Sequence, residues 1–484
     1  MSLAMTPAQC RAARLARDAR FDGRFFTGVL TTGIYCRPVC PARAPLEHNV
    51  RYFFSAAAAE QAGLRPCLRC RPELAPAERQ VLPPLLQRAL QAMERGELVD
   101  SSLEALAQRC GGTARTLRRQ SEHYLGLAPL QLEQTRRLLL AKQLLTDSAL
   151  SVTEIAYAAG YGSLRRFNDV WLTAYGTPPS RLRRQALRAP SGTLCLALSY
   201  RPPYDFAAML AFFRLRAIAG LEEVTAESYR RYLDGNLGRE GAWLEVRAGT
   251  GASLQLTLHG VALRQLPALL YRVRRMWDLD ADPQPIQAQL TASPVLAPYI
   301  LAAPGLRLPS GWDHYEVLLR AIIGQQISVK GAVTLLGRLV ARRRDCFGSL
   351  ALPDAAELLS MPLDGLGLTG ARIRTLQALA TALQQGLVLA EASDAQLLAL
   401  PGIGPWTLAY WRLRCGDDPD AFPAGDLVLQ KALLPETRLS AAALTAYAEA
   451  WRPWRAYAAR GAPTPPVGCG RRPPADGCSI SITR

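Results

Sequence analysis

Four cysteines fall within a short stretch of the chain as two closely spaced pairs, Cys36-x3-Cys40 and Cys67-x2-Cys70. Each pair can supply two thiolate ligands from one tight turn, and four thiolates in a tetrahedron are a common zinc site. We therefore predict one zinc ion held by Cys36, Cys40, Cys67 and Cys70. The spacing alone leaves open whether this zinc only stabilises a small domain or also activates a sulfur atom for chemistry.

A second candidate is a carboxylate, Asp426, which follows the glycine-rich turn Leu400-Pro-Gly-Ile-Gly-Pro-Trp-Thr-Leu-Ala-Tyr410. This turn has the pattern of a helix-hairpin-helix motif. Its residues Gly402 and Gly404 would let backbone N–H groups at the start of a helix approach a DNA phosphate. An isolated aspartate is more often a helix cap or a solvated charge than a catalytic group.

The elements that must position these residues are mainly helices. Residues 102–119 predict a helix, a glycine turn and a second helix, and the pattern recurs in residues 151–171 after a connecting helix over Gln131–Leu145. A single copy of this pattern is typical of an ordinary helical hairpin. Two copies favour a pair of helix-turn-helix units. A strand-like segment, Thr193–Tyr200, then opens a different kind of domain.

Length, charge and hydropathy narrow the class of protein. A chain of 484 residues is long enough for about three domains. The net charge is +17, and the excess of cations is densest in the first 190 residues, as expected for a protein that binds a polyanion. No apolar run reaches the roughly 18 residues of a membrane span, so we expect no membrane partner.

The cysteine region resembles the N-terminal domain of the Ada family of DNA repair proteins over about residues 5–80. The resemblance rests on Thr31-Thr-Gly-Ile-Tyr-Cys36-Arg-Pro-Val-Cys40-Pro-Ala-Arg43 and Arg65-Pro-Cys67-Leu-Arg-Cys70-Arg-Pro72. It implies that the zinc is both structural and catalytic, and that Cys36 accepts a methyl group from a DNA methylphosphotriester. The flanking arginines are then candidates for DNA contacts: Arg43, Arg65, Arg69 and Arg71.

The two helix-turn-helix patterns, which end in Tyr175-Gly-Thr-Pro-Pro-Ser, look like the AraC-type DNA-binding domain over about residues 85–187. Arginine pairs well with guanine and asparagine with adenine in the major groove. The candidates for groove contacts are therefore Arg115, Arg118, Arg165 and Asn168.

The remainder, from Tyr200-Arg-Pro-Pro-Tyr-Asp-Phe onward, resembles the AlkA-like 3-methyladenine DNA glycosylase II family. This resemblance implies that Asp426 is catalytic, that Gln326 is the wedge that fills the gap left by a flipped base, and that Trp406 and Tyr410 pack the extruded base. Trp406 stands where related lyases carry a Schiff-base lysine, which implies a monofunctional glycosylase. The match ends after Ala459, and a tryptophan that lines the family's base pocket is missing.

The predicted fold is multidomain, mainly α with α+β parts. It comprises an Ada-like zinc and methyl-acceptor domain (1–80), an AraC-type double helix-turn-helix domain (85–187), an AlkA-like N-terminal α+β domain (192–300), a helix-hairpin-helix glycosylase domain (301–460) and a disordered or altered tail (461–484).

The expected function is DNA alkylation repair combined with adaptive-response regulation. It joins stoichiometric methyl transfer, promoter binding and hydrolytic release of alkylated purines. Its partners would be double-stranded DNA, both alkylated and at promoters, and RNA polymerase, and its location the cytoplasm, in association with the nucleoid. The alternative is a transcription regulator whose glycosylase-like half is inactive.

Overall fold

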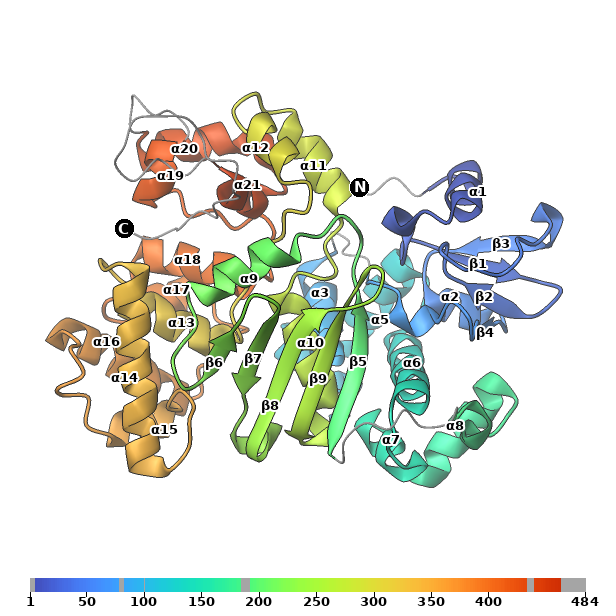
Figure 1. Cartoon of the computed structure of the whole chain (residues 1–484), viewed down its shortest axis with the longest axis horizontal. Coiled ribbons are helices and arrows are strands. Elements are labelled where there is room, and N and C mark those ends of the chain that lie inside the picture. Colours follow the sequence, from blue (N-terminus) through green and yellow to red (C-terminus); the bar gives the residue numbers. More distant parts are fainter. Residues whose placement is uncertain (1–4, 78–81, 100, 184–191, 433–438, 463–484) are drawn as a thin grey trace.

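The computed structural model describes residues 5–77, 82–99, 101–183, 192–432 and 439–462. A five-stranded sheet lies at the centre of the molecule, between a small four-stranded sheet and a large group of helices (Figure 1). The predicted tail lies outside the described residues from residue 463 onward. None of the described helices is long and apolar enough to cross a membrane.

The N-terminal region, which we call the zinc module, covers residues 5–77. Its strands are β1 (Phe26–Val29), β2 (Ile34–Cys36), β3 (Val50–Phe53) and β4 (Arg65–Pro66), in the order β3-β1-β2-β4, and its helices are α1 (Pro7–Ala16) and α2 (Ala56–Gln61). A small core of Phe26, Tyr35, Phe53, Ala59 and Leu64 holds these elements together. With so few apolar side chains, a module of this size gains from a bound metal.

Six helices follow, and they confirm the predicted pair of helix-turn-helix units. They are α3 (Pro84–Glu94), α4 (Leu103–Arg109), α5 (Ala114–Leu125), α6 (Pro129–Asp147), α7 (Val152–Ala158) and α8 (Leu164–Tyr175). Ser151-Val-Thr-Glu154 has the sequence pattern of a capping box, and the structure shows that box at the start of α7. Gly126 and Gly176 end α5 and α8 in left-handed conformations that favour glycine.

The five-stranded sheet is antiparallel and has the order β5-β9-β8-β7-β6. Its strands are β5 (Thr193–Ser199), β6 (Glu222–Val224), β7 (Ser228–Tyr232), β8 (Gly238–Ala248) and β9 (Ser253–Val261), and helices α9 (Phe206–Arg214) and α10 (Leu266–Met276) accompany them. The apolar side of this sheet shares one continuous core with residues of α6–α8. The second helix-turn-helix unit is therefore packed onto the sheet domain.

The C-terminal helices form two further cores, one centred on α13, α14, α16 and α18 and the other on α11, α12, α20 and α21. Their bounds are α11 (Pro283–Thr291), α12 (Ala297–Ala302), α13 (His314–Ile323), α14 (Val329–Phe347), α15 (Ala355–Ser360), α16 (Gly370–Gln384), α17 (Asp394–Leu398), α18 (Pro405–Cys415), α19 (Leu427–Ala432), α20 (Ala441–Ala448) and α21 (Arg455–Gly461). Helix α18 contributes residues to both cores and so joins them.

Buried polar contacts fasten the zinc module to the rest of the chain. The guanidinium of Arg201, which is fully buried, donates to the carbonyl oxygens of Pro76 at 3.3 Å and Ala77 at 2.9 Å. Arg24 pairs with Asp282, at the start of α11. Because an unpaired charge in such a position is costly, these contacts define a specific docking of the module against the C-terminal half.

Candidate functional sites

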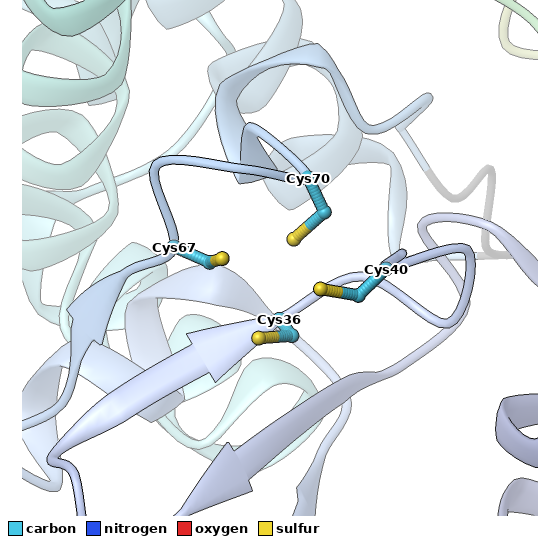
Figure 2. Close-up of side chains that lie close together, drawn as sticks. All are labelled: Cys36, Cys40, Cys67 and Cys70. Carbon is cyan, nitrogen blue, oxygen red and sulfur yellow. The ribbon is translucent and has the colours of Figure 1, made fainter. Parts of the chain in front are cut away.

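The four predicted zinc ligands come together at one end of the small sheet. Cys36 ends β2, Cys40 follows in the next loop, and Cys67 and Cys70 lie on the turn after β4, with all four sulfur atoms directed toward one another (Figure 2). The sulfur atoms lie within 4.8 Å of one another. Zinc–thiolate bonds of about 2.3 Å require sulfur–sulfur separations of roughly 4 Å in a tetrahedron. The cluster thus has the ligand type and the spacing for one zinc ion.

Backbone N–H groups donate to two of the four sulfur atoms, those of Cys67 and Cys70. The backbone N–H of Arg37 donates to Sγ of Cys70 at 3.3 Å, and that of Arg69 donates to Sγ of Cys67 at 3.4 Å. Contacts with the three neighbouring sulfurs, and then burial, raise the pKa of the Cys36 thiol. A divalent cation held by the four sulfur atoms would offset this rise and keep the sulfur deprotonated at neutral pH.

Cys36 borders a pocket of about 770 Å³ on the surface of the zinc module. Cys36 is half-buried, whereas Cys67 and Cys70 are buried. The pocket is lined by apolar side chains such as Leu15 and Leu68 and by the arginines Arg17, Arg43 and Arg69. A half-exposed sulfur beside an apolar pocket with a cationic rim fits a neutral methyl ester within an otherwise anionic polymer.

The two other arginines predicted near this site have partners elsewhere in the protein. Arg71 bonds to Asp147 at 2.6 Å, at the end of α6, and to Glu73 at 3.1 Å. Arg65 is exposed, and its Nη1 donates to the carbonyl oxygen of Tyr175 at 3.4 Å. Both side chains therefore link the zinc module to the helix-turn-helix region.

The second helix of each helix-turn-helix unit presents one polar face to solvent. On α5, Arg115 and Arg118 are exposed, and Arg118 pairs with Glu104 at 3.0 Å. On α8, Arg165 is exposed and Asn168 is half-buried, while Phe167 and Trp171 on the opposite face are buried. The arrangement leaves these predicted groove-contacting faces accessible to a large ligand.

Asp426 caps a helix and also borders a cleft. Its Oδ1 accepts hydrogen bonds from the N–H groups of Val428 at 2.9 Å and Leu429 at 3.2 Å, in the first turn of α19. Its Oδ2 accepts a hydrogen bond of 3.3 Å from the indole Nε1 of Trp406. The residue is only 3% exposed, yet it borders a cleft of about 600 Å³. One oxygen thus fixes the carboxylate at the start of α19, while the other contacts Trp406, which borders the same cleft.

The predicted phosphate-binding turn and wedge line the same cleft as Asp426. Gly402 has a φ of 80°, and a Cβ atom there would lie 2.0 Å from Oγ1 of Thr375. Gln326 is exposed and has a φ of 56°, a left-handed conformation that is strained for a residue with a side chain. Strain of this kind is concentrated at functional sites, which fits a residue held out into the cleft.

The two predicted base-packing aromatics lie one behind the other on α18. The rings of Trp406 and Tyr410 stack with their centroids 5.4 Å apart and an interplanar angle of 17°. Trp406 borders the cleft, whereas Tyr410 borders a separate small cavity behind it. The structure therefore brings Asp426, Gln326, Gly402, Gly404 and Trp406 together and places Tyr410 one layer deeper.

The sequence analysis did not identify Gln325, which connects the segment before α14 to the glycine-rich turn before α18 through hydrogen bonds. Its Nε2 donates to the carbonyl oxygen of Gly402 at 2.8 Å and to Oγ1 of Thr407 at 3.0 Å. Its position next to Gln326 was the available signal. The partner lies 77 residues away in the sequence, which no local pattern reveals.

Comparisons with known proteins agree with this architecture. The model of the metal-binding domain of Ada matches residues 9–73, a helix-turn-helix domain model matches residues 106–185, and the AlkA N-terminal domain model matches residues 195–313. The "Probable bifunctional transcriptional activator/DNA repair enzyme AlkA" of Mycobacterium tuberculosis is 39% identical over 474 residues, covering 93% of this chain and 94% of that protein. The chain belongs to this family of bifunctional activator/repair proteins.

Two relatives each match one part of this AlkA-type activator/repair chain. The DNA-3-methyladenine glycosylase 2 of Escherichia coli is 32% identical over 285 residues, which cover 54% of this chain and 94% of that enzyme. The "Bifunctional transcriptional activator/DNA repair enzyme Ada" of Escherichia coli is 37% identical over 147 residues, 30% of this chain and 40% of that protein.

Proposed function

We propose that this protein repairs alkylated DNA and regulates the response to alkylation, with double-stranded DNA as its partner. The observation that carries the proposal is the presence, on one chain, of a four-cysteine cluster beside an open pocket and a buried carboxylate beside a glycine-rich cleft. Methyl acceptance and base release both repair DNA that has been alkylated. Such a protein would act in the cytoplasm, on the nucleoid.

The first activity is methyl transfer from a DNA methylphosphotriester to Cys36. The sulfur attacks the methyl carbon, a C–S bond forms, and the C–O bond breaks with its electron pair remaining on the phosphodiester. Cys36, Cys40, Cys67 and Cys70 would hold a zinc ion, which would keep the sulfur a thiolate at neutral pH. Arg17, Arg43 and Arg69 at the pocket rim would hold the neighbouring phosphates. The thioether product is stable, so each molecule acts once.

The second activity is hydrolytic release of alkylated purines. As the base departs, positive charge develops on the sugar, and Asp426 stabilises that charge. Gly402 and Gly404 would position the DNA backbone, and Gln326 would fill the space of the flipped nucleotide. Because Trp406 stands beside the carboxylate and carries no amine, we expect no strand cleavage without added alkali.

The regulatory activity would use α5 and α8 on promoter DNA, with Arg115, Arg118, Arg165 and Asn168 as groove contacts. Methylation of Cys36 removes one negative charge from a surface that faces DNA, which lowers repulsion and tightens binding. An activator of this type would then recruit RNA polymerase.

The test is incubation of the purified, zinc-loaded protein with DNA that carries a radiolabelled methyl group. We expect label both on the protein, at Cys36, and in free methylated base. Cys36→Ala should remove the protein label and leave base release intact, whereas Cys346→Ala, at an exposed cysteine outside the cluster, should change neither. Label on the protein without released base would favour a regulator with an inactive glycosylase half. Label on Cys40, Cys67 or Cys70 would contradict the assignment of the acceptor.

A further inference from the structure

The segment that carries the predicted wedge lies between α13 and α14 and lines the cleft that Asp426 borders. Within it, Gln326 is exposed and has a φ of 56°. A residue with a side chain keeps such a left-handed conformation only where its surroundings fix it. The contacts of the neighbouring residues therefore determine where the wedge lies.

The side chain of Gln325 connects this segment to the glycine-rich turn before α18. Its Nε2 donates to the carbonyl oxygen of Gly402 at 2.8 Å and to Oγ1 of Thr407 at 3.0 Å. An amide nitrogen carries two hydrogens, so both bonds form at once. Gly402 precedes Gly404, the N-cap of α18, and Thr407 lies in the first turn of that helix. One amide group thus contacts both sides of the turn that we expect to hold a DNA phosphate.

The N-terminal part of α16 contacts the same two segments. Nη2 of Arg372 donates to the backbone carbonyl oxygen of Gln325. Thr375, one helical turn further along, is 4% exposed and packs closely against Gly402, where a Cβ atom would lie 2.0 Å from its Oγ1. Helix α16 shares one apolar core with α13, α14 and α18. The wedge segment and the turn are therefore attached to each other and to one helix of that core.

The contacts of Gln325 also define what this residue does not do. Both hydrogens of its amide nitrogen are directed to acceptors in the protein. Asp426 is held separately, by the first turn of α19 and by Trp406. An effect of Gln325 on the reaction would therefore pass through the two segments that it connects.

We propose that Gln325 is a positioning residue that fixes the wedge Gln326 relative to the phosphate-binding turn, so that binding of the DNA backbone and filling of the gap left by the flipped base occur together. The inference rests on the proposed glycosylase function and adds a residue that couples two parts of its site. With Gln325 in place, the wedge is ordered before DNA binds, and little conformational freedom is lost when it inserts. Without it, the phosphate contact and the carboxylate remain, but the wedge segment loses its attachment to the turn.

This coupling affects most strongly the lesions that are costly to extrude. A paired base must be unpaired as well as unstacked before it enters the pocket, whereas an unpaired base needs less energy. A loosely held wedge therefore slows the release of a paired lesion more than that of an unpaired lesion. A general loss of folded protein, by contrast, lowers both rates by the same factor.

The test measures base release by the full-length protein under single-turnover conditions. One duplex carries 7-methylguanine opposite cytosine, and the other carries it opposite a stable abasic-site analogue. Gln325→Met keeps the length of the side chain but removes the donor, so the paired rate should fall about tenfold and the unpaired rate less than about threefold. Gln377→Met makes the same change at an exposed position on α16 and should alter neither rate. An unchanged ratio of paired to unpaired rates in Gln325→Met would overturn the inference.

A second comparison shows whether Gln325 acts through Gln326. Gln326→Ala should itself lower the release of the paired lesion. Adding Gln325→Met to that variant should lower the rate further by less than about twofold, because the side chain that Gln325 positions is already absent. A full tenfold loss in both backgrounds would contradict a role through the wedge.

The fluorescence of 2-aminopurine placed beside the lesion separates this inference from the proposed function. An inserted wedge unstacks the probe and raises its emission, whether or not the lesion is released. At saturating protein, the rise should be smaller for Gln325→Met than for the wild type. A wild type that gives this Gln325-dependent rise but releases no base would contradict the proposed glycosylase activity and support the coupling. Equal emission with the wild type and Gln325→Met would overturn the coupling, even where base release continues.

Discussion

At the scale of single residues, Asp426 caps helix α19 and is also the carboxylate to which we assign a part in base release. Asp426→Asn should leave the cap of α19 in place, because asparagine caps helices as well as aspartate does. It removes the charge that opposes the developing cation, so release of alkylated purines should fall by about 100-fold to 1000-fold. Single-turnover base release measures this change, and a gel-shift assay should show nearly unchanged DNA binding.

The matched control for that substitution is Asp345→Asn, which makes the same chemical change at an exposed position on α14. It should leave base release and DNA binding unaltered. Equal base release by the wild type and Asp426→Asn would show that the carboxylate only caps its helix.

The zinc cluster offers a second residue-scale prediction. Cys67→Ser should lose tightly bound zinc, measured by metal analysis, and full retention would contradict the four-cysteine ligand set.

At the scale of elements, two glycines of one turn should respond differently to the same substitution. Gly402→Ala places a Cβ in a left-handed conformation and 2.0 Å from Oγ1 of Thr375, so we expect it to destabilise the C-terminal helices by about 2–4 kcal/mol. Gly404 has a φ of −98°, and a Cβ there meets no atom within 4 Å. Gly404→Ala should cost no more than about 1 kcal/mol. Calorimetry on both variants measures the difference, and equal melting temperatures would contradict it.

Short sequence patterns determine the local elements of this fold, which is why these elements could be predicted from the sequence. The capping box at Ser151 and the alternating strand that begins at Thr193 each depend on neighbours within a few residues. The paired cysteines likewise predicted their own cluster, since metal ligands constrain residue type as well as spacing. The roles predicted for Asp426 and Gln326 were based on a family resemblance, because no local sequence pattern distinguishes a catalytic aspartate from a helix cap.

At the scale of the whole molecule, the contacts that the sequence did not predict are those between distant segments. Arg201 donates to the carbonyl oxygens of Pro76 and Ala77 in the zinc module, and Arg216 and Arg414 meet around Phe212 although about 200 residues separate them. Because arginine is abundant in this sequence, its occurrence at one position does not indicate which distant residue it contacts. Packing of α6–α8 onto the five-stranded sheet was equally hidden, because each element has an apolar face that any other could cover.

One of these inter-module contacts should make stability depend on pH. Glu60 of the zinc module accepts hydrogen bonds from Tyr35 at 2.9 Å and from Thr135 of α6 at 2.7 Å, and burial raises its pKa from 4.5 to about 7. Between these two values the folded protein binds more protons than the unfolded chain. The free energy of unfolding therefore falls as the pH rises through this window, by at most about 3 kcal/mol, and the loss is complete above pH 7.

Glu60→Gln tests whether Glu60, at the contact between the zinc module and α6, causes this pH dependence of stability. Glutamine has no charge to bury, so the variant should lose most of the change in denaturant midpoint between pH 5 and 8 and should be more stable than the wild type at pH 8. Glu122→Gln, at an exposed position on α5, should retain the wild-type pH dependence. Both variants are compared in the zinc-loaded state, so that metal affinity does not contribute to the difference. Parallel pH profiles for the two variants would show that the Glu60 carboxyl group does not control how the module is held against the helix-turn-helix region.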